Sequence, residues 1–264
     1  FGTDGIRGEA NRYPMDAAIA FSVGQAVANL FRKTGHRTRV VIGKDTRISG
    51  YMLESSLEAG VSSMGGISYL VRVLPTPGIA FIAQSMRADA GIVISASHNP
   101  YQDNGIKIFS GSGFKLSDEQ EETIENLILS GKLPEMVPEA KEMGRAYRME
   151  DAPGRYIVFL KNTFPRDLSM EGMKVVIDAA NGATYRVCPA AFTELGASVD
   201  VIHNNPDGLN INDNCGSQYT QNLEKRVVET GATIGLAFDG DGDRLIAGDE
   251  KWLTITGDQI LIIC

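Results

Sequence analysis

Three aspartates occupy alternate positions in the segment Asp239-Gly240-Asp241-Gly242-Asp243, with only glycine between them. No intervening side chain blocks the approach of the carboxylates, and glycine lets the backbone fold into a tight turn. Neighbouring carboxylates repel one another unless a cation binds them, and their hard oxygens suit Mg²⁺ better than a soft transition metal. Asp239, Asp241 and Asp243 are therefore predicted to bind a metal ion, with Mg²⁺ as the metal.

Two other interpretations of this segment are weaker. A solvated acidic turn is disfavoured because the segment directly follows an apolar run that is typical of a strand. An EF-hand calcium loop would use the three aspartates and Glu250 as ligands. However, Arg244 stands where that loop needs glycine, and residues 245–247 continue as a strand where an EF-hand would have a helix.

A second polar loop, Ser95 to Pro100, also follows a buried strand. A free hydroxyl is a poor nucleophile, but a phosphoserine is a phosphoryl donor whose charge a cation can neutralise. Ser97 and the three aspartates are therefore compatible with one site, and the neighbouring His98 is a further catalytic candidate. Taken alone, a Ser-His pair is more often a turn held by hydrogen bonds.

Four basic residues are candidates for catalysis or phosphate binding. Lys107 follows Ser97 by ten residues and could return on the neighbouring strand to face the same cleft, either as a base or as a cation that pairs with phosphate. Arg7, Arg47 and Arg244 lie in glycine-rich loops, and arginine binds phosphate with two hydrogen bonds. For Arg7 and Arg47 a solvated surface role is an equal alternative.

Apolar runs along the chain predict an α/β fold that brings these loops together. In the first half we expect strands at 39–43, 67–73 and 90–94, and helices at 52–64, 78–86 and 117–129, the last with a capping box formed by Ser117 and Gln120. Residues 131–150 lack this periodicity and are interpreted as a linker. In the second half we expect helices at 155–162, 184–195 and 223–229, and strands at 174–178, 198–202 and 233–238.

The two halves form a weak internal repeat, in which Val40 to Ile42 correspond to Val175 to Ile177. In each copy the third strand is followed by one of the polar loops, and ligands of open α/β sheets bind outside the carboxyl ends of strands. The predicted fold class is two consecutive α/β/α domains with mixed, mostly parallel sheets. The domains are placed at 1–150 and 151–255, with 256–264 as the start of a third.

Composition excludes several classes of protein. With 264 residues and 43% hydrophobic side chains, the chain can bury two cores of ordinary size. A net charge of −8 argues against a nucleic-acid partner. The start shows no signal peptide, and no apolar run approaches the ~18 residues of a membrane span, so a cytoplasmic protein is expected. Because Phe1 is not an initiator methionine and the chain stops inside an apolar helix pattern, we expect the natural protein to continue.

These motifs together resemble the α-D-phosphohexomutase family over the whole chain. The resemblance rests on the segments Phe1 to Gly8, Gly43 to Gly50, Ser95 to Lys107, Gly208 to Asn212 and Asp239 to Arg244. It implies that Ser97 is a phosphoserine, that its phosphate oxygen joins the three aspartates in binding Mg²⁺, and that Lys107 and Arg244 act beside them. It also implies four domains in the full enzyme, so that this chain alone is expected to be inactive.

The implied reaction converts glucosamine 6-phosphate to glucosamine 1-phosphate, a step toward UDP-N-acetylglucosamine and the bacterial cell wall. A sugar 1,6-bisphosphate is the implied intermediate and activator. The implied partner is a hexosamine phosphate, with no nucleic acid and no membrane, and a homodimer is left open.

Three rival functions remain at this stage. The first is a family member that acts on mannose or glucose phosphates. The second is a phosphatase that forms an aspartyl phosphate on Asp239. The third is a module that binds metal and sugar phosphate without turnover.

Overall fold

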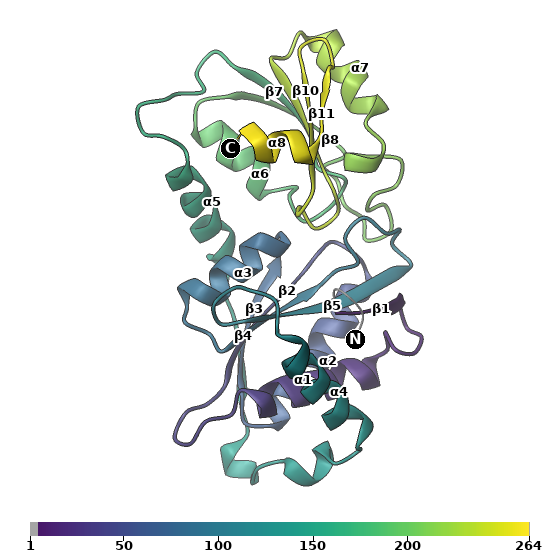
Figure 1. Ribbon diagram of the computed structural model, residues 1–264, viewed down its shortest axis with the longest axis vertical. Coiled ribbons are helices and arrows are strands. Elements are labelled where there is room, and N and C mark those ends of the chain that lie inside the picture. The colour runs from purple at the N-terminus through teal and green to yellow at the C-terminus, as the bar shows by residue number, and fades with distance from the viewer. Residues whose placement is uncertain (1–4, 264) are drawn as a thin grey trace.

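Two β-sheets lie end to end along the long axis of the protein, each between layers of helices (Figure 1). The computed structural model describes residues 5–263. Residues 1–4 of the Phe1 to Gly8 segment therefore lie outside the described residues. We refer to the parts built around the two sheets as the first and the second unit.

The strands and helices have the following bounds. The strands are β1 (Ile6–Glu9), β2 (Arg39–Lys44), β3 (Ile67–Val73), β4 (Ala90–Ile94), β5 (Asp103–Ser110), β6 (Arg145–Arg148), β7 (Lys174–Asp178), β8 (Ser198–Ile202), β9 (Ile234–Phe238), β10 (Leu245–Asp249) and β11 (Thr254–Ile255). The helices are α1 (Ala17–Leu30), α2 (Ser49–Ser63), α3 (Thr76–Ser85), α4 (Asp118–Leu129), α5 (Ala152–Thr163), α6 (Val187–Glu194), α7 (Gln221–Thr230) and α8 (Gly257–Ile263).

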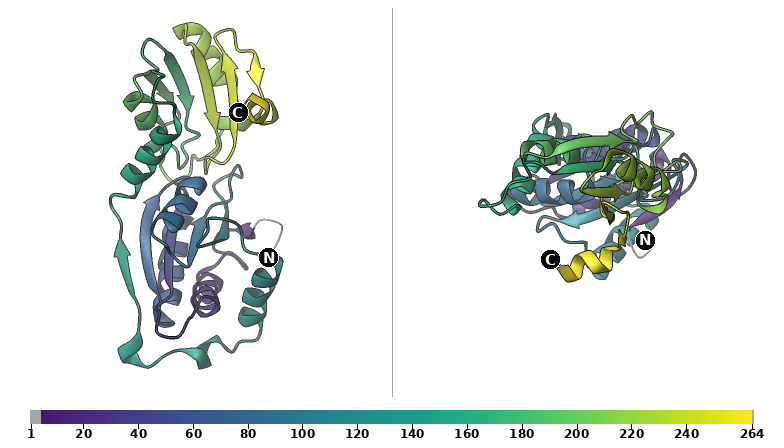
Figure 2. Two further views of the ribbon diagram at one scale, coloured as in Figure 1. Left: turned by 60° about the vertical axis from the view of Figure 1, so that its left-hand side comes forward. Right: turned by 90° about the horizontal axis from the view of Figure 1, so that it is seen from above.

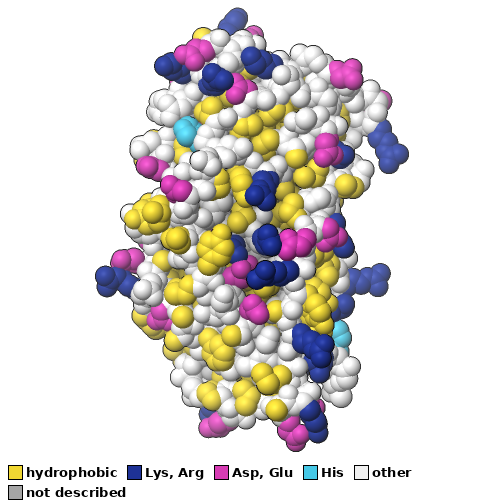
Figure 3. Space-filling model, turned by 180° about the vertical axis from the view of Figure 1, so that it is seen from behind, with side chains coloured by type: hydrophobic (Ala, Val, Ile, Leu, Met, Phe, Trp, Pro, Cys, Tyr) yellow, Lys and Arg dark blue, Asp and Glu magenta, His cyan; other side chains and the backbone are white. Residues whose placement is uncertain are grey.

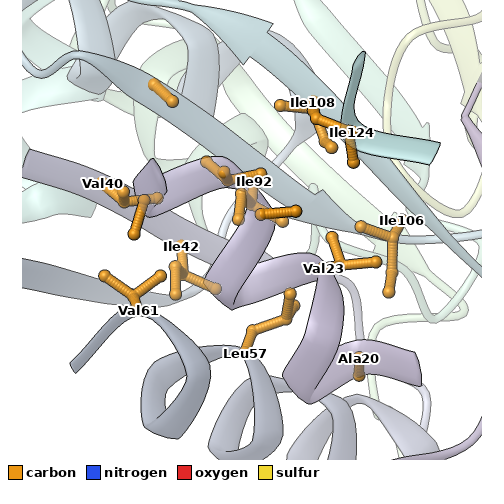
Figure 4. Close-up of a cluster of buried hydrophobic side chains, with 14 of the residues drawn as sticks. Ala20, Val23, Val40, Ile42, Leu57, Val61, Ile92, Ile106, Ile108 and Ile124 are labelled. Atoms are coloured by element: carbon orange, nitrogen blue, oxygen red, sulfur yellow. The ribbon is translucent and has the colours of Figure 1, made fainter. Parts of the chain in front are cut away.

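The first sheet has the strand order β1-β5-β4-β2-β3-β6. The neighbouring strands β4, β2, β3 and β6 are parallel to one another. Strand β5 is antiparallel to both of its neighbours, β4 and β1. Alternate residues of its central strands point to opposite faces, where α1, α2 and α4 cover one core and α3 and α5 cover the other. Figure 4 shows the first of these cores, with labelled side chains Ala20, Val23, Val40, Ile42, Leu57, Val61, Ile92, Ile106, Ile108 and Ile124.

The second sheet repeats the topology of the first. Its order is β11-β10-β9-β7-β8, so that β10-β9-β7-β8 correspond to β5-β4-β2-β3. The predicted repeat and the predicted fold class of two α/β/α units with mixed sheets are therefore confirmed. The second sheet is evenly mixed rather than mostly parallel, because short connections make β9, β10 and β11 antiparallel neighbours, whereas a parallel pair needs a long crossover.

The segment between the units is not only a linker. It contains two 3₁₀ turns, Leu133–Met136 and Ala140–Glu142, and then β6, which adds a sixth strand in parallel to β3. The interpretation of residues 131–150 as a linker is thus wrong for Arg145–Arg148, which belong to the first sheet. In Figure 2 this segment passes along the outer edge of the first sheet before α5 leads into the second unit.

The surface between the units is rich in charge. On the face drawn in Figure 3, Lys, Arg, Asp and Glu side chains gather across the middle of the protein. A hollow of about 430 Å³ at this level is lined by residues of both units, including Lys44, Glu54, Arg72 and Arg186. No helix among the described residues has the length and apolar character that crossing a membrane requires.

Candidate active site

The two polar loops meet where the units face each other. Ser97 follows β4 in the first unit and Asp239 follows β9 in the second. The Ser97 hydroxyl donates a hydrogen bond to Asp239 Oδ2 at 2.6 Å, and both residues are at most 2% exposed. The structure therefore brings together the two segments in which the sequence placed the nucleophile and the metal ligands.

The three aspartates form a cluster that could hold a cation. Asp239, Asp241 and Asp243 offer carboxylate oxygens that all lie within 4.8 Å of one another. Oδ2 of Asp241 accepts hydrogen bonds from the Thr76 hydroxyl at 2.7 Å and from Lys107 Nζ at 2.9 Å. Oδ1 of Asp241 is buried and has no hydrogen-bond partner among the described residues. An unsatisfied buried oxygen is costly, so the cluster fits a hard cation that would bind this atom.

The electrostatics of the cluster indicate a shortage of positive charge. Burial, together with the charge of Asp241, raises the pKa of Asp239 to about 7. Burial also acts to raise the pKa of Asp241, but the Lys107 ammonium and the Thr76 hydrogen bond outweigh it, and the pKa of Asp241 is lowered. Lys107 thus stabilises the charge of one carboxylate, while Asp239 is held in an unfavourable environment for its charge.

Lys107 lies on β5, opposite Val93 of the neighbouring strand β4. The sequence had suggested that Lys107 lies on a strand next to the one that precedes Ser97. Its side chain is 5% exposed. Besides Asp241, its Nζ contacts Asp243 Oδ2 at 3.2 Å. The ammonium group therefore lies beside the aspartate cluster.

A further predicted residue, His98, lies beside Ser97, and the predicted residues Arg7 and Arg244 are near His98. His98 Nδ1 lies 3.4 Å from Ser97 Oγ. Burial, and then the nearby charges of Arg244 and Arg7, lower the pKa of His98. The side chains of Arg7 and Arg244 are exposed, while the backbone N–H of Arg244 donates to Asp239 Oδ1 at 3.1 Å. Two cationic groups are thus close enough to influence His98 and can meet an anionic ligand there.

The position of Arg47 differs from what the sequence led us to expect. Phosphate binding and a solvated surface position were equal alternatives for Arg47, but the residue is 0% exposed and its guanidinium pairs with the buried carboxylate of Asp45. The same guanidinium donates to the backbone carbonyls of Ser97 at 3.2 Å and of Asn99 at 2.5 Å. Arg47 therefore holds the Ser97 loop from inside the first unit and does not face a ligand.

Two residues of the site were missed by sequence reasoning. Thr76, at the start of α3, binds Asp241 across the units, and its only sequence signal was the break at Pro75-Thr76-Pro77. Asn212 donates from Nδ2 to the carbonyls of Ser97 and Asn99 at 2.9 and 3.0 Å. It belongs to the Gly208 to Asn212 segment, which was noted only as part of a resemblance.

Known proteins are similar to this chain in sequence and in fold. Residues 1–135 match the family described as phosphoglucomutase/phosphomannomutase, alpha/beta/alpha domain I, and residues 154–252 match domain II of the same family. Over 264 residues the chain is 75% identical to the phosphoglucosamine mutase of Syntrophobacter fumaroxidans and 62% identical to that of Syntrophus aciditrophicus. Both matches cover 100% of this chain and 59% of the relative, so the chain spans little more than half the length of these curated relatives.

A solved structure agrees with the sequence relatives. A phosphoglucomutase/phosphomannomutase family protein from Burkholderia thailandensis superposes with a TM-score of 0.83 and 27% identity, over 98% of this chain and 56% of that chain. The fold, the matched domains and the identity to curated relatives lead to one conclusion. The chain belongs to the phosphoglucomutase/phosphomannomutase family.

Proposed function

We propose that the protein to which this chain belongs is a phosphoglucosamine mutase, which interconverts glucosamine 6-phosphate and glucosamine 1-phosphate. The observation that carries the proposal is the 75% identity, along all 264 residues, to a curated phosphoglucosamine mutase. The contact between Ser97 and the aspartate cluster supports the phosphoserine chemistry of the same proposal.

In the proposed reaction Ser97 carries the phosphoryl group. The bond between phosphorus and Ser97 Oγ breaks as a bond to the free sugar hydroxyl forms, which leaves a sugar 1,6-bisphosphate. The proton of the sugar hydroxyl passes to a nearby base, for which Lys107 and His98 are the candidates. The bisphosphate then reorients, and the other phosphoryl group passes to Ser97 Oγ as its bond to the sugar oxygen breaks. The base returns the proton to that oxygen. Arg7 and Arg244 are the proposed contacts of the substrate phosphate.

Mg²⁺ is the proposed metal, held by the three aspartates and an oxygen of phosphorylated Ser97. When bound, it supplies positive charge that neutralises the transferring phosphoryl group. The orphaned Asp241 oxygen and the raised pKa of Asp239 support this assignment, because both are relieved by a cation. Positioning and charge neutralisation then account for most of the work of the protein in such a transfer.

The proposal includes the organisation of the protein. The first and second domains are placed at 1–150 and 151–255, with 256–264 as the start of a third, and the two separate sheets support this division. The proposed location is the cytoplasm, because phosphorylated sugars do not cross membranes unaided. Light scattering of the whole protein tests whether it forms a homodimer.

Turnover of the whole protein tests the proposal. With Mg²⁺ and a catalytic amount of glucose 1,6-bisphosphate, glucosamine 6-phosphate is expected to have a much higher kcat/KM than mannose 6-phosphate or glucose 6-phosphate. Ser97→Ala is expected to lose nearly all turnover, and intact mass with phosphopeptide mapping should place one phosphoryl group on Ser97. Faster turnover of mannose 6-phosphate would reassign the substrate. Full activity of Ser97→Ala would favour an aspartyl phosphate on Asp239 instead.

A further inference from the structure

Asn212 lies at the point where the two reacting loops touch. Its Nδ2 donates to the backbone carbonyls of Ser97 at 2.9 Å and Asn99 at 3.0 Å, across the boundary between the units. The aspartate loop packs against the same amide, because a Cβ atom added to Gly240 would lie 2.7 Å from both Asn212 Nδ2 and the Ser97 carbonyl oxygen. One side-chain amide therefore contacts the serine loop and the aspartate loop at once.

The two carbonyls are held from both units. Arg47 of the first unit donates to the same carbonyl oxygens, those of Ser97 and Asn99, that accept from Asn212 of the second unit. A carbonyl oxygen has two lone pairs, so both donors are accommodated at each atom. Without Asn212, each carbonyl would still have Arg47 as its partner. The loop would lose two hydrogen bonds to the second unit and keep the one from Ser97 Oγ to Asp239.

Ser97 needs such support because its backbone is unusual. Its φ is +53°, in the left-handed region that residues other than glycine rarely adopt. Such a conformation persists only where the surroundings fix it. The hydrogen bonds to the Ser97 carbonyl, together with one from its N–H to Ser95 Oγ at 2.9 Å, provide that restraint. The direction in which Ser97 Oγ points is therefore tied to Asn212.

The aspartate loop of the second unit is likewise held by a residue of the first unit. Thr76 of the first unit donates from its N–H to the Asp241 carbonyl at 2.9 Å and from its hydroxyl to Asp241 Oδ2 at 2.7 Å. Each of the two loops is thus held by a residue of the other unit. The distance between Ser97 Oγ and the aspartates is consequently fixed by contacts between the units as well as by each unit alone.

We propose that Asn212 is a positioning residue that sets the Ser97 loop against the aspartate cluster, without itself touching the substrate. Removal of its amide should let the loop move relative to the aspartates. A small misplacement of reacting groups can cost ~100-fold in rate, and loss of an outer partner of metal ligands typically costs ~10–100-fold in metal affinity or activity. The inference rests on the proposed function for its kinetic and Mg²⁺ readouts, whereas the hydrogen-exchange readout does not depend on it.

Asn212→Gly in the whole protein is the sharpest test. Asn212 itself has a φ of +58°, and glycine adopts this conformation without strain, so the substitution removes the amide and leaves the backbone free to keep its shape. We expect kcat to fall ~10–100-fold with little change in KM, and the Kd for Mg²⁺, measured by titration calorimetry, to rise ~10-fold or more. Amide hydrogen exchange of residues 97–99 should accelerate. Asn212→Asp, which keeps the side-chain shape and replaces the donor by an acceptor, should show the same changes and serves if the glycine variant does not fold.

Asn214→Gly is the matched control. It has a φ of +51°, lies two residues further along the same loop and is exposed, and its side chain donates to the neighbouring Asp213. If Asn212→Gly and Asn214→Gly have equal kcat, equal Mg²⁺ affinity and equal exchange at residues 97–99, the inference is wrong. If the unaltered protein shows no mutase turnover while only Asn212→Gly weakens Mg²⁺ binding and loosens the loop, the proposed function fails and the role of Asn212 stands.

Discussion

At the scale of single residues, Arg47 shows the limit of reading a side chain from its type. The sequence places Arg47 in a glycine-rich loop beside the site, which is typical of a phosphate-binding arginine. What the sequence cannot report is that the residue is fully buried and faces Asp45 and two backbone carbonyls. Burial raises the pKa of Asp45, and the charge of Arg47 partly offsets that effect. The pair is therefore part of the internal support of the Ser97 loop.

Replacing Arg47 should be costly for stability. Arg47→Ala leaves the buried Asp45 carboxylate without its cation, and breaking a buried ion pair typically costs about 3–5 kcal/mol in the free energy of unfolding. Urea unfolding followed by circular dichroism measures this change. Arg72→Ala is the control, because the pair of Arg72 with Glu150 has side chains 57% and 62% exposed, and exposed pairs contribute about 0–1 kcal/mol. Similar losses in the two variants would contradict the structural role of Arg47.

His203 predicts a dependence of stability on pH. Its Nδ1 lies 2.9 Å from Oδ2 of the buried Asp178, and this hydrogen bond raises the pKa of His203 although burial opposes it. A group whose pKa is higher in the folded than in the unfolded state stabilises the fold fully below its unfolded pKa, about 6.5, and this stabilisation is lost as the pH rises through the folded pKa.

The test compares the protein with His203→Asn, since asparagine tolerates the φ of +48° found at this position. The difference in free energy of unfolding between the two proteins should be larger at pH 6 than at pH 9. A difference that stays constant with pH would show that the His203 charge does not contribute.

At the scale of elements, the sequence predicts most strands of the two sheets well. It does not predict elements whose apolar residues are not confined to one face. The predicted bounds of β3, β4, β7 and β8 equal the observed ones, because each is a β-branched or apolar run between turn residues. The capping box at the start of α4 is also confirmed. In contrast, α1 was not predicted, because it has no charged residue and is small or apolar on most sides, so that no helical period of hydrophobic residues is visible. Strand β6 was not predicted because it is a short, polar strand at the edge of the sheet.

Helices α1 and α2 pack so closely that replacing a glycine of α2 by alanine should destabilise the fold, although alanine has the higher helix propensity. A Cβ atom added to Gly60 of α2 would lie 2.1 Å from the carbonyl oxygen of Phe21 in α1. Gly60→Ala should therefore push the helices apart and cost about 1–3 kcal/mol in free energy of unfolding. Gly154→Ala in α5 is the control, because nothing lies within 4 Å of the added atom, and it should stabilise by at most about 1 kcal/mol. Chemical denaturation measures both, and stabilisation by Gly60→Ala would refute the close approach.

At the scale of the whole molecule, several hydrogen bonds between the units lie at or near the candidate site. Besides the bonds of Ser97, Thr76 and Asn212, the Thr46 hydroxyl donates to the Asn181 carbonyl at 2.6 Å, and Ile48 N–H donates to the Gly208 carbonyl at 3.0 Å. The repeated topology let the sequence place both polar loops at the carboxyl ends of strands. It could not predict that these two ends face each other, because that arrangement depends on contacts between residues more than a hundred positions apart.

A metal ion at this site should therefore stabilise the docking of the two units. Its proposed ligands come from both units, and a ligand that binds only the folded protein stabilises it by about 2.7 kcal/mol at a free concentration of 100 times its Kd. Thermal unfolding with saturating Mg²⁺ should occur at a higher temperature than after removal of metal by EDTA, and hydrogen exchange around Thr46 and Asn181 should slow.

The choice of variant separates this effect from the general influence of charge. Asp243→Asn removes one carboxylate of the cluster whose side chain is 36% exposed, so the fold should survive while the shift with Mg²⁺ disappears. Glu122→Gln removes one negative charge from an exposed position on α4 and should keep the full shift. If both variants respond to Mg²⁺ as the unaltered protein does, the ion acts elsewhere on the acidic surface. If only Asp243→Asn loses the response and exchange at the contact between Thr46 and Asn181 no longer slows, then the cluster that binds the metal also couples the two units.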